Sequence, residues 1–502
     1  MAGDDAPPEV IGLALSGGGF RAAAFHLGVL KRLRELGLLS RLHILSTVSG
    51  GSIAGAVWAF LHSAVGMEAA SDGHTITEED VWSDVESTLL STMIRGVRGV
   101  VVLSAFIFPA VVLALIAGGV LLLSGVTMPR ILVAVVAVLA LAYVCWHYFA
   151  AAALEKCYEK DFYGKLKLKD IAALPLVMLN ATTLNFGHHV VFSNMEPDTS
   201  YAGLLSDLMR RTTARSALLR SRPSISMPRA TTIARAVAAS SAFPGAFAPL
   251  RFTRVFDRVV GFFRKPLWGE SVSSGELSVI DGGVFDNQGT HLIGHLCHHL
   301  IISDGAGALQ EQRRPSTWQI WPPGKGIIFR AQDIIYERLR DLGYAHLEER
   351  RAFSETLLRC AGAETMREME RERQGPYLRS YSYVELMPPK RFAWIDGEQR
   401  LPEELLPLVA AIRTDLDRFS KIEISALMFH GYTMIDHCLR VYQRELYPAD
   451  APPLRFTLPP GGVFANWSNP TPEEIARAAA HLQVSSARSG LWRGLYRRAK
   501  SV

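Results

Sequence analysis

Three short apolar runs in this chain each end in a glycine-rich turn, and this recurrence constrains the fold more than any other feature. The turns lie at residues 17–19, 49–51 and 281–283. A strand, a turn and a helix are predicted over residues 10–36, because apolar residues behind the first turn recur at helical spacing. A second such unit follows over residues 43–62. Two units in succession predict an α/β fold with a mainly parallel sheet.

The three turns also carry the groups that acyl transfer needs. Functional residues of α/β sheets collect at the carboxyl ends of strands, and glycines there let backbone N–H groups approach a ligand. The first turn offers N–H donors, the second offers Ser49 and the third offers Asp281. Together they supply the parts of an oxyanion hole, a nucleophile and a base.

Two uncharged runs, Gly99–Ser124 and Ile131–Leu154, contribute much of the 49% hydrophobic content of the chain. Each has roughly 20 residues or more, enough to cross a hydrocarbon core about 30 Å thick, so we expect a transmembrane helical hairpin. Two arginines precede the pair, lysines follow it between residues 156 and 169, and the connection holds only Arg130. The positive-inside rule then places the bulk of the protein in the cytoplasm. The alternative is a helical pair buried in a soluble protein.

The composition of the chain indicates what kind of surface it binds, whether it holds disulfides or zinc, and in which compartment it works. The net charge of +5 over 502 residues is mild, and without an Arg-rich element it indicates an anionic surface such as a membrane rather than nucleic acid. The 5 cysteines are scattered and form no C-x-x-C pair, so we expect neither a disulfide framework nor a zinc ribbon, and a reducing compartment. Residues 1–12 lack the pattern of a signal peptide.

Other interpretations of these motifs are weaker. The block GGGFRA fits a dinucleotide-binding loop, but the next strand ends at Ser49 instead of the acidic residue that such a site requires. The histidines between residues 291 and 299 lack the ligand spacing of known metal sites, and we expect a helix there. His26 and His43 could act as a base, but we expect them away from the carboxyl end of the second strand. We therefore expect no metal and no cofactor.

The order of these blocks resembles the patatin-like phospholipase family of serine acyl hydrolases. LSGGGFRAAAFHLGVL is similar to the oxyanion loop of the family, and STVSGGSIAGA is similar to its nucleophile elbow. NATTLNFG, AASSAFPGAFAPL and VIDGGVFDNQG resemble its later blocks, and residues 413–436 resemble the end of larger bacterial members. The resemblance implies a three-layer α/β/α sandwich and hydrolysis of acyl esters of lipids without a cofactor.

By this resemblance Ser49 is the nucleophile and Asp281 is the base of a Ser–Asp dyad. Arg21 either helps to hold an anion or braces the glycine loop. An ordinary aspartate has a pKa of about 3.9, which is too low for an efficient base, so we expect burial to raise the pKa of Asp281. The resemblance assigns the oxyanion hole to the backbone amides of Gly17, Gly18 and Gly19.

One residue departs from the elbow pattern. Thr47 stands where G-x-S-x-G has its first glycine, which relieves crowding in a strained turn. We expect the turn to be slightly more open, with Gly50 and Gly51 keeping the side that faces the helix bare.

The sequence therefore predicts a membrane-anchored serine lipid acyl hydrolase of the phospholipase A or lysophospholipase type, facing the cytoplasm. Its substrate is an acyl lipid, and its other partner is the bilayer. A non-catalytic membrane scaffold and a soluble carboxylesterase with a buried lid are the alternatives. The expected division of the chain is a catalytic domain over 1–96 and 155–450, a hairpin over 97–154 and a basic, aromatic tail over 451–502.

Overall fold

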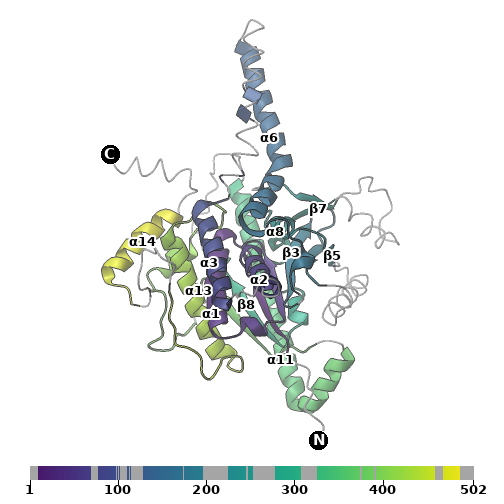
Figure 1. Cartoon of the computed structure of the whole chain (residues 1–502), viewed down its shortest axis with the longest axis vertical. Coiled ribbons are helices and arrows are strands. Elements are labelled where there is room, and N and C mark those ends of the chain that lie inside the picture. The colour runs from purple at the N-terminus through teal and green to yellow at the C-terminus, as the bar shows by residue number, and fades with distance from the viewer. Residues whose placement is uncertain are drawn as a thin grey trace.

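The fold is a sheet enclosed by helices, with one helix, α6 (Met128–Tyr158), projecting from this body (Figure 1). Most of the first predicted apolar run and the end of the predicted tail lie outside the described residues. The computed structural model describes residues 9–68, 77–97, 128–172, 174–195, 224–244, 247–252, 277–306, 325–373, 376–388, 392–457 and 469–486, with residues 99, 101, 110, 111, 113, 114 and 467.

The central strands of the sheet are parallel. β1 (Ile11–Leu15) pairs in parallel with β2 (Ile44–Val48) and β8 (His299–Asp304). In the same way β2 pairs with β3 (Leu176–Thr183), and β8 pairs with β9 (Ser380–Glu385). The predicted α/β fold with a mainly parallel sheet is thereby confirmed. The main path of the sheet runs in the order β5 (Ile225–Met227), β4 (His189–Ser193), β3 (Leu176–Thr183), β2 (Ile44–Val48), β1 (Ile11–Leu15), β8 (His299–Asp304) and β9 (Ser380–Glu385).

Antiparallel pairing is confined to one side of the sheet. β3 pairs with β4 and with β7 (Leu277–Asp281), and β7 pairs with β6 (Leu250–Phe252). This side of the sheet carries the third glycine turn, because Asp281 is the last residue of β7.

Helices cover both faces of the sheet and make it a three-layer sandwich. Successive residues of β1 face opposite cores: Leu13 and Leu15 belong to the larger apolar cluster and Ala14 belongs to the smaller one. The larger core is shared with α1 (Gly19–Glu35), α2 (Gly50–Glu68), α3 (Glu78–Arg95), α8 (Ile233–Ser240) and α13 (Lys421–Tyr442).

The smaller core lies under α11 (Lys325–Arg373), whose Leu347 is buried in it. Leu292 and Ile293 are also buried in the smaller core. The predicted helix over the histidine-rich segment is wrong: Ile293–His295 forms a single 3-10 turn before β8 begins. Only a few residues separate this turn from β8, so no longer helix can form.

Helices α1 and α13 pack closely because glycines stand at their crossing. A Cβ at Gly28 would lie 1.9 Å from the carbonyl oxygen of Met428, and a Cβ at Gly431 would lie 2.2 Å from that of Phe25. Side chains at these positions would push the helices apart. The close packing holds α1, and with it the glycine loop at its start, against the C-terminal part of the chain.

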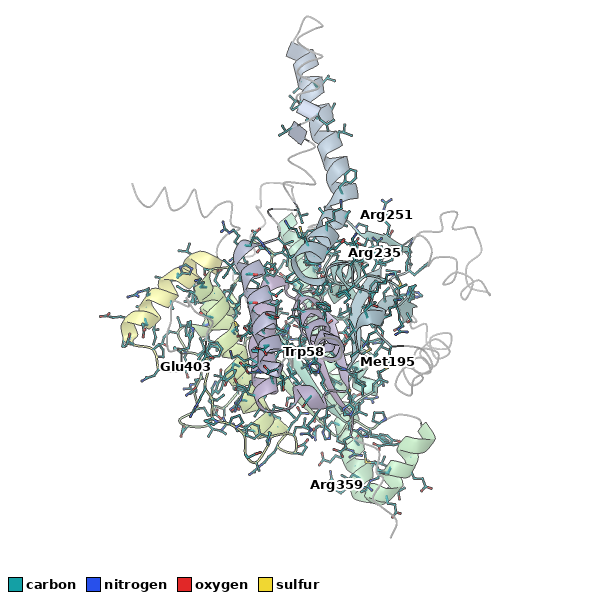
Figure 2. All side chains as sticks on the ribbon, in the orientation of Figure 1. Trp58, Met195, Arg235, Arg251, Arg359 and Glu403 are labelled. Carbon is teal, nitrogen blue, oxygen red and sulfur yellow. The ribbon has the colours of Figure 1, made fainter. Side chains whose placement is uncertain are left out.

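The two ends of α6 differ in their surroundings. Ala150, Leu154 and Tyr158 are fully buried in the larger core. Glu155 forms an ion pair of 2.7 Å with Arg235, which lies with Arg251 at the base of α6 (Figure 2). Farther along the helix several of the described apolar side chains are exposed: Leu132, Val133, Val135, Val136, Leu141 and Phe149.

No helix within the described ranges has the length and mean hydropathy of a membrane span. The predicted transmembrane hairpin is therefore unsupported. Most of its first run lies outside the described residues, and the last turns of its second run are buried in the protein core.

Candidate active site

Ser49 lies at the junction of β2 and α2, where the sequence predicted a nucleophile elbow. Its φ angle is +50°, and among the described residues it is the one non-glycine with a positive φ. The left-handed region costs a residue with a Cβ roughly 1–2 kcal/mol, and such strain collects at functional sites. Ser49 is 8% exposed, so its side chain lies just beneath the surface.

Glycines allow the elbow and the first glycine loop to lie against each other. A Cβ at Gly50 would lie 2.1 Å from the carbonyl oxygen of Gly19, and one at Gly51 would lie 2.3 Å from that of Leu15. The Gly51 N–H also donates to the carbonyl oxygen of Ser16 at 3.1 Å. The first two predicted turns are therefore in direct backbone contact.

Thr47 fits into the elbow because of another glycine. Its Cγ2 lies 2.7 Å from the place where a Cβ of Gly55 would stand. Thr47 is completely buried. The branched side chain that replaces the usual glycine is thus accommodated by a bare position one turn into α2.

Asp281 meets Ser49 because β2 and β7 approach the same edge of β3 from opposite directions. The parallel strand β2 ends at Val48, which pairs with Asn180 of β3. The antiparallel strand β7 ends at Asp281, which pairs with the next residue of β3, Ala181. The two strand ends face each other, and the Ser49 side chain lies close enough to the Asp281 carboxylate to lower its pKa.

Burial makes Asp281 a stronger base than an ordinary aspartate. The carboxyl group is 3% exposed, and the loss of water around its charged form raises its pKa from 3.8 to about 6. The Gly283 N–H, which donates to the Asp281 carboxylate at 2.7 Å, and the neighbouring Ser49 side chain oppose this rise. Asp281 is therefore ionised near neutral pH and still able to accept a proton.

The glycine loop has two amides that point to no acceptor. The Gly17 N–H donates to the carbonyl oxygen of Asn287 at 2.9 Å, which ties this loop to the segment after Asp281. Gly18 and Gly19 have φ angles of +140° and +58°, and in the part of the chain that is described their N–H groups have no acceptor. Of the three predicted oxyanion donors, Gly18 and Gly19 are thus available to a ligand.

Arg21 braces the loop from behind. Its Nε donates to the carbonyl oxygen of Gly305 at 3.1 Å, and its Nη1 donates to those of Ala410 and Ile412 at 3.1 and 2.8 Å. The side chain is 6% exposed. These contacts favour the bracing role over a role in holding an anion.

Neither of the competing histidines is placed to serve Ser49. His26 is buried in α1, with its ring nitrogens 3.0 Å from the Ser16 carbonyl oxygen and 2.7 Å from the Ser303 hydroxyl. Burial lowers the pKa of His26 to about 4, so it is neutral near pH 7. His43 lies at the amino end of β2, where its Nδ1 accepts from the Ile11 N–H.

The side chains of the histidine-rich segment contact other parts of the fold. Over the described ranges, no group of three or more histidine, cysteine, aspartate or glutamate side chains could hold a metal ion. His295 contacts Arg350, His298 accepts the Val10 N–H, and His299 pairs with Glu9. His298 and His299 make these contacts at the amino ends of β1 and β8.

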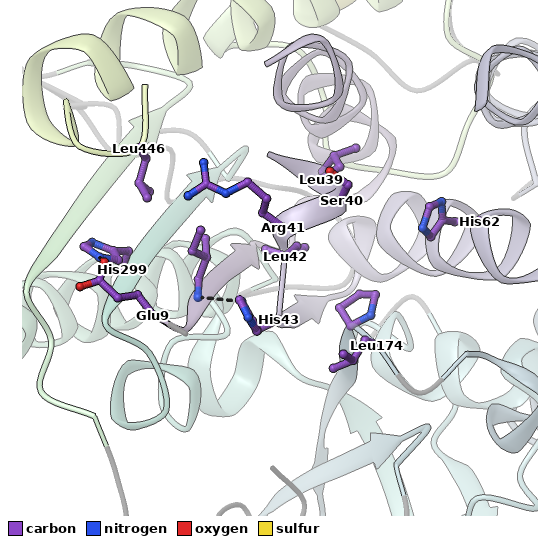
Figure 3. Close-up of a pocket in the computed structure, with 12 residues that line it drawn as sticks. Glu9, Leu39, Ser40, Arg41, Leu42, His43, His62, Leu174, His299 and Leu446 are labelled. Carbon is purple, nitrogen blue, oxygen red and sulfur yellow. Dashed lines mark hydrogen bonds and ion pairs between the residues drawn. The ribbon is translucent and has the colours of Figure 1, made fainter. Parts of the chain in front are cut away.

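Figure 3 shows a cavity of about 520 Å³. Its lining includes Arg41, His43, His62, Leu174 and His299. His43 and His299 stand where β2 and β8 begin. The cavity therefore lies at the amino ends of the strands and is separate from the dyad.

Comparison with known proteins finds a family match in the first part of the chain. Residues 13–96 match the family model described as patatin-like phospholipase. This segment contains the glycine loop and Ser49 and ends before Asp281. No curated protein matches this chain. The crystal structure of VipD from Legionella pneumophila matches with 14% identity and a TM-score of 0.31, covering 86% of this chain and 67% of that chain.

Proposed function

We propose, on the premise that residues 13–96 belong to the patatin-like phospholipase family, that this protein is a serine hydrolase that cleaves acyl esters of membrane lipids. The family match supports a lipid hydrolase. The observation that carries the finer proposal is the meeting of Ser49 and Asp281 at the edge of β3. We assign Ser49 as the nucleophile and Asp281 as the base.

The proposed reaction begins with attack of the Ser49 Oγ on the acyl carbonyl carbon, while the hydroxyl proton passes to the Asp281 carboxylate. The carbonyl oxygen becomes an oxyanion that accepts hydrogen bonds from the Gly18 and Gly19 amides. One such donor is worth roughly 2.7–4 kcal/mol of transition-state stabilisation. The ester C–O bond then breaks, and the leaving alcohol takes the proton from Asp281.

The second half of the reaction restores the enzyme. The acyl group remains on Ser49 as an ester after the alcohol has left. Water attacks this ester and gives its proton to Asp281, and the carboxylic acid product leaves as Ser49 regains a proton. Asp281 acts as base and then as acid in each half, which its pKa of about 6 suits near neutral pH.

We further propose that α6 brings this site to a membrane surface. Leu132, Val133 and Val136 are exposed, and neighbouring positions on a helix lie about 100° apart, so the apolar surface extends around the helix. Exposed lysines between residues 156 and 169 suit an anionic lipid surface. At the buried end of α6, the Tyr158 hydroxyl lies 3.1 Å from that of Ser241, beside α8 and near Asp281.

We propose the cytoplasmic face of the membrane as the location, because its anionic lipids suit the exposed lysines between residues 156 and 169.

The function is tested by labelling and by product release. Purified protein is treated with a fluorophosphonate, which reacts with activated serines, and the modified residue is located by mass spectrometry. In parallel, fatty acid release is measured from phospholipid vesicles and from a water-soluble p-nitrophenyl ester. We expect label on Ser49 and fatty acid release from vesicles. Absence of both would support a non-catalytic scaffold, and hydrolysis of the soluble ester alone would support a soluble carboxylesterase.

Polar substitution on α6 is expected to weaken membrane binding. The triple variant Leu132→Gln, Val133→Gln, Val136→Gln removes apolar surface that would enter the lipid, so sedimentation with anionic vesicles should fall by at least about 10-fold. The ratio of vesicle activity to soluble-ester activity should fall with it.

The matched control makes the same change at exposed apolar residues elsewhere, in Leu358→Gln, Ile395→Gln, Val441→Gln. Equal vesicle binding by the two triple variants would contradict the role of α6.

A further inference from the structure

A chain of buried hydroxyl groups lies beneath the nucleophile elbow. The Thr47 Oγ1 lies 2.9 Å from the Ser52 Oγ, which lies 2.8 Å from the Ser240 Oγ. The Ser240 Oγ donates to the carbonyl oxygen of Asn180 at 2.6 Å and accepts the backbone N–H of Ser49 at 3.0 Å. Ser240 is completely buried, so these contacts replace water.

The donors and acceptors of this chain can be arranged in one order. A serine hydroxyl has one proton and two lone pairs. Since Ser240 gives its proton to the carbonyl oxygen of Asn180, it accepts from Ser52. Ser52 then accepts from Thr47, and both lone pairs of Ser240 are used, by Ser52 and by the Ser49 N–H. The three hydroxyl contacts run in the same direction, from Thr47 to β3, and hydrogen bonds in such a chain strengthen one another. The Thr47 Oγ1 also lies 3.4 Å from the carbonyl oxygen of Met178, a longer contact than the one to Ser52.

Ser240 is also tied to the turn that carries the base. Its backbone carbonyl oxygen accepts the Gly282 N–H at 3.3 Å, and the carbonyl oxygen of Ala242 accepts the Asp281 N–H at 3.1 Å. The end of α8 therefore touches the residue after the base and, through the Ser240 hydroxyl, the amide of the nucleophile.

We propose that Ser240 is the positioning residue that sets Ser49 and Asp281 relative to each other, with Thr47 and Ser52 holding its hydroxyl in place. This proposal rests on the proposed function. Ser49 has a strained backbone with a φ of +50°, and such a conformation persists only where surrounding contacts hold it. The Ser240 hydroxyl fixes the Ser49 amide, and its carbonyl fixes the neighbour of Asp281. Because residue 47 is a threonine instead of a glycine, its hydroxyl can donate the first hydrogen bond of this hydroxyl chain, to Ser52.

The experiment compares Ser240→Ala with Ser63→Ala. Ser63 is a matched control, because its buried hydroxyl accepts the Ala172 N–H at 2.9 Å and donates to the Ala59 carbonyl oxygen at 2.6 Å, near the other end of α2. We expect Ser240→Ala to slow fluorophosphonate labelling of Ser49 by at least 10-fold and to lower kcat for the soluble ester, with KM within 2-fold. Ser63→Ala should keep the labelling rate of the unmodified protein. These factors follow from the cost of misplaced reacting groups.

A second pair of variants tests the hydroxyl chain by rescue. Thr47→Val removes the first proton with nearly the same shape, and Thr47→Ser keeps it. Labelling should slow in Thr47→Val and be restored in Thr47→Ser. Slowing in both would assign the effect to packing and contradict the hydroxyl chain.

Hydrogen exchange of the Ser49 amide separates this proposal from the proposed function. Loss of its acceptor in Ser240→Ala should speed exchange in peptides covering residues 46–52, whereas Ser63→Ala should not. If the unmodified protein neither reacts with the fluorophosphonate nor cleaves an ester, the proposed function fails. The hydrogen-exchange result then tests only whether the Ser240 hydroxyl accepts the Ser49 N–H. Unchanged labelling, or unchanged exchange, in Ser240→Ala overturns the positioning role.

Discussion

Replacement of Ser49 by alanine is expected to lower acyl release by about 10⁴-fold or more, because loss of the nucleophile removes the covalent route and leaves only binding and the oxyanion donors. The variant should keep the fold, since alanine removes only the hydroxyl group and the backbone N–H still donates to the Ser240 hydroxyl. Fatty acid release from vesicles and hydrolysis of the soluble ester measure the loss, and far-ultraviolet circular dichroism checks the fold. Activity above about 1% of the unmodified rate would show that Ser49 is not the nucleophile.

A glycine at the same position separates chemistry from strain. Ser49→Gly should be as inactive as Ser49→Ala. It should also have a higher free energy of unfolding, by about 1 kcal/mol, because glycine adopts a φ of +50° without the penalty of a Cβ. Urea denaturation of the two variants measures this difference. Equal stability would mean that the elbow stores no such strain.

Replacement of Asp281 by asparagine is expected to lower kcat by about 10³-fold or more, because the base is lost, and to stabilise the protein at the same time. The fold raises the pKa of this carboxyl group from 3.8 to about 6. Folding therefore favours the protonated form, and the unmodified protein loses stability as pH rises from about 4 to 6. An asparagine is always neutral, so Asp281→Asn should be more stable at pH 8 by up to about 3 kcal/mol, with no difference near pH 3.

Two measurements check the behaviour of Asp281. Urea denaturation at pH 3 and pH 8 gives the difference in stability, with the exposed Asp450→Asn as a control that should change neither activity nor stability. The kcat/KM of the unmodified protein for the soluble ester should rise with pH through an apparent pKa of about 6, because only the carboxylate accepts the proton. A profile that stays flat from pH 5 to 8, or a less stable asparagine variant at pH 8, would contradict this role.

The local pattern of the sequence was enough to predict the strand–turn–helix units. The strand, turn and helix of each of the first two units lie close together in the sequence, and apolar spacing and glycines define them. The elbow at Ser49 and the loop at residues 17–19 are therefore local features. The histidine-rich segment was predicted wrongly to be a helix. Its apolar residues are buried in the smaller core from a single 3-10 turn that leads directly into β8.

Contacts between distant segments could not be predicted from spacing. Gly17 was expected to be an oxyanion donor, but its N–H is taken by Asn287. Arg21 could have held an anion, but three distant carbonyl groups accept its protons. The last turns of α6 were expected in lipid, but Ala150 and Leu154 are buried in the core. In each case the partner comes from an element far along the chain.

The sequence by itself determined the parallel α/β architecture and the residue types of the site, because apolar periodicity and glycine turns act over short distances. The tertiary structure decided which of those residues meet. Ser49 and Asp281 face each other because a parallel and an antiparallel strand end at adjacent residues of β3. The Ser240 hydroxyl reaches the Ser49 amide because α8 ends beneath the elbow. Strand register and helix packing depend on the whole chain, so no local motif could have specified them.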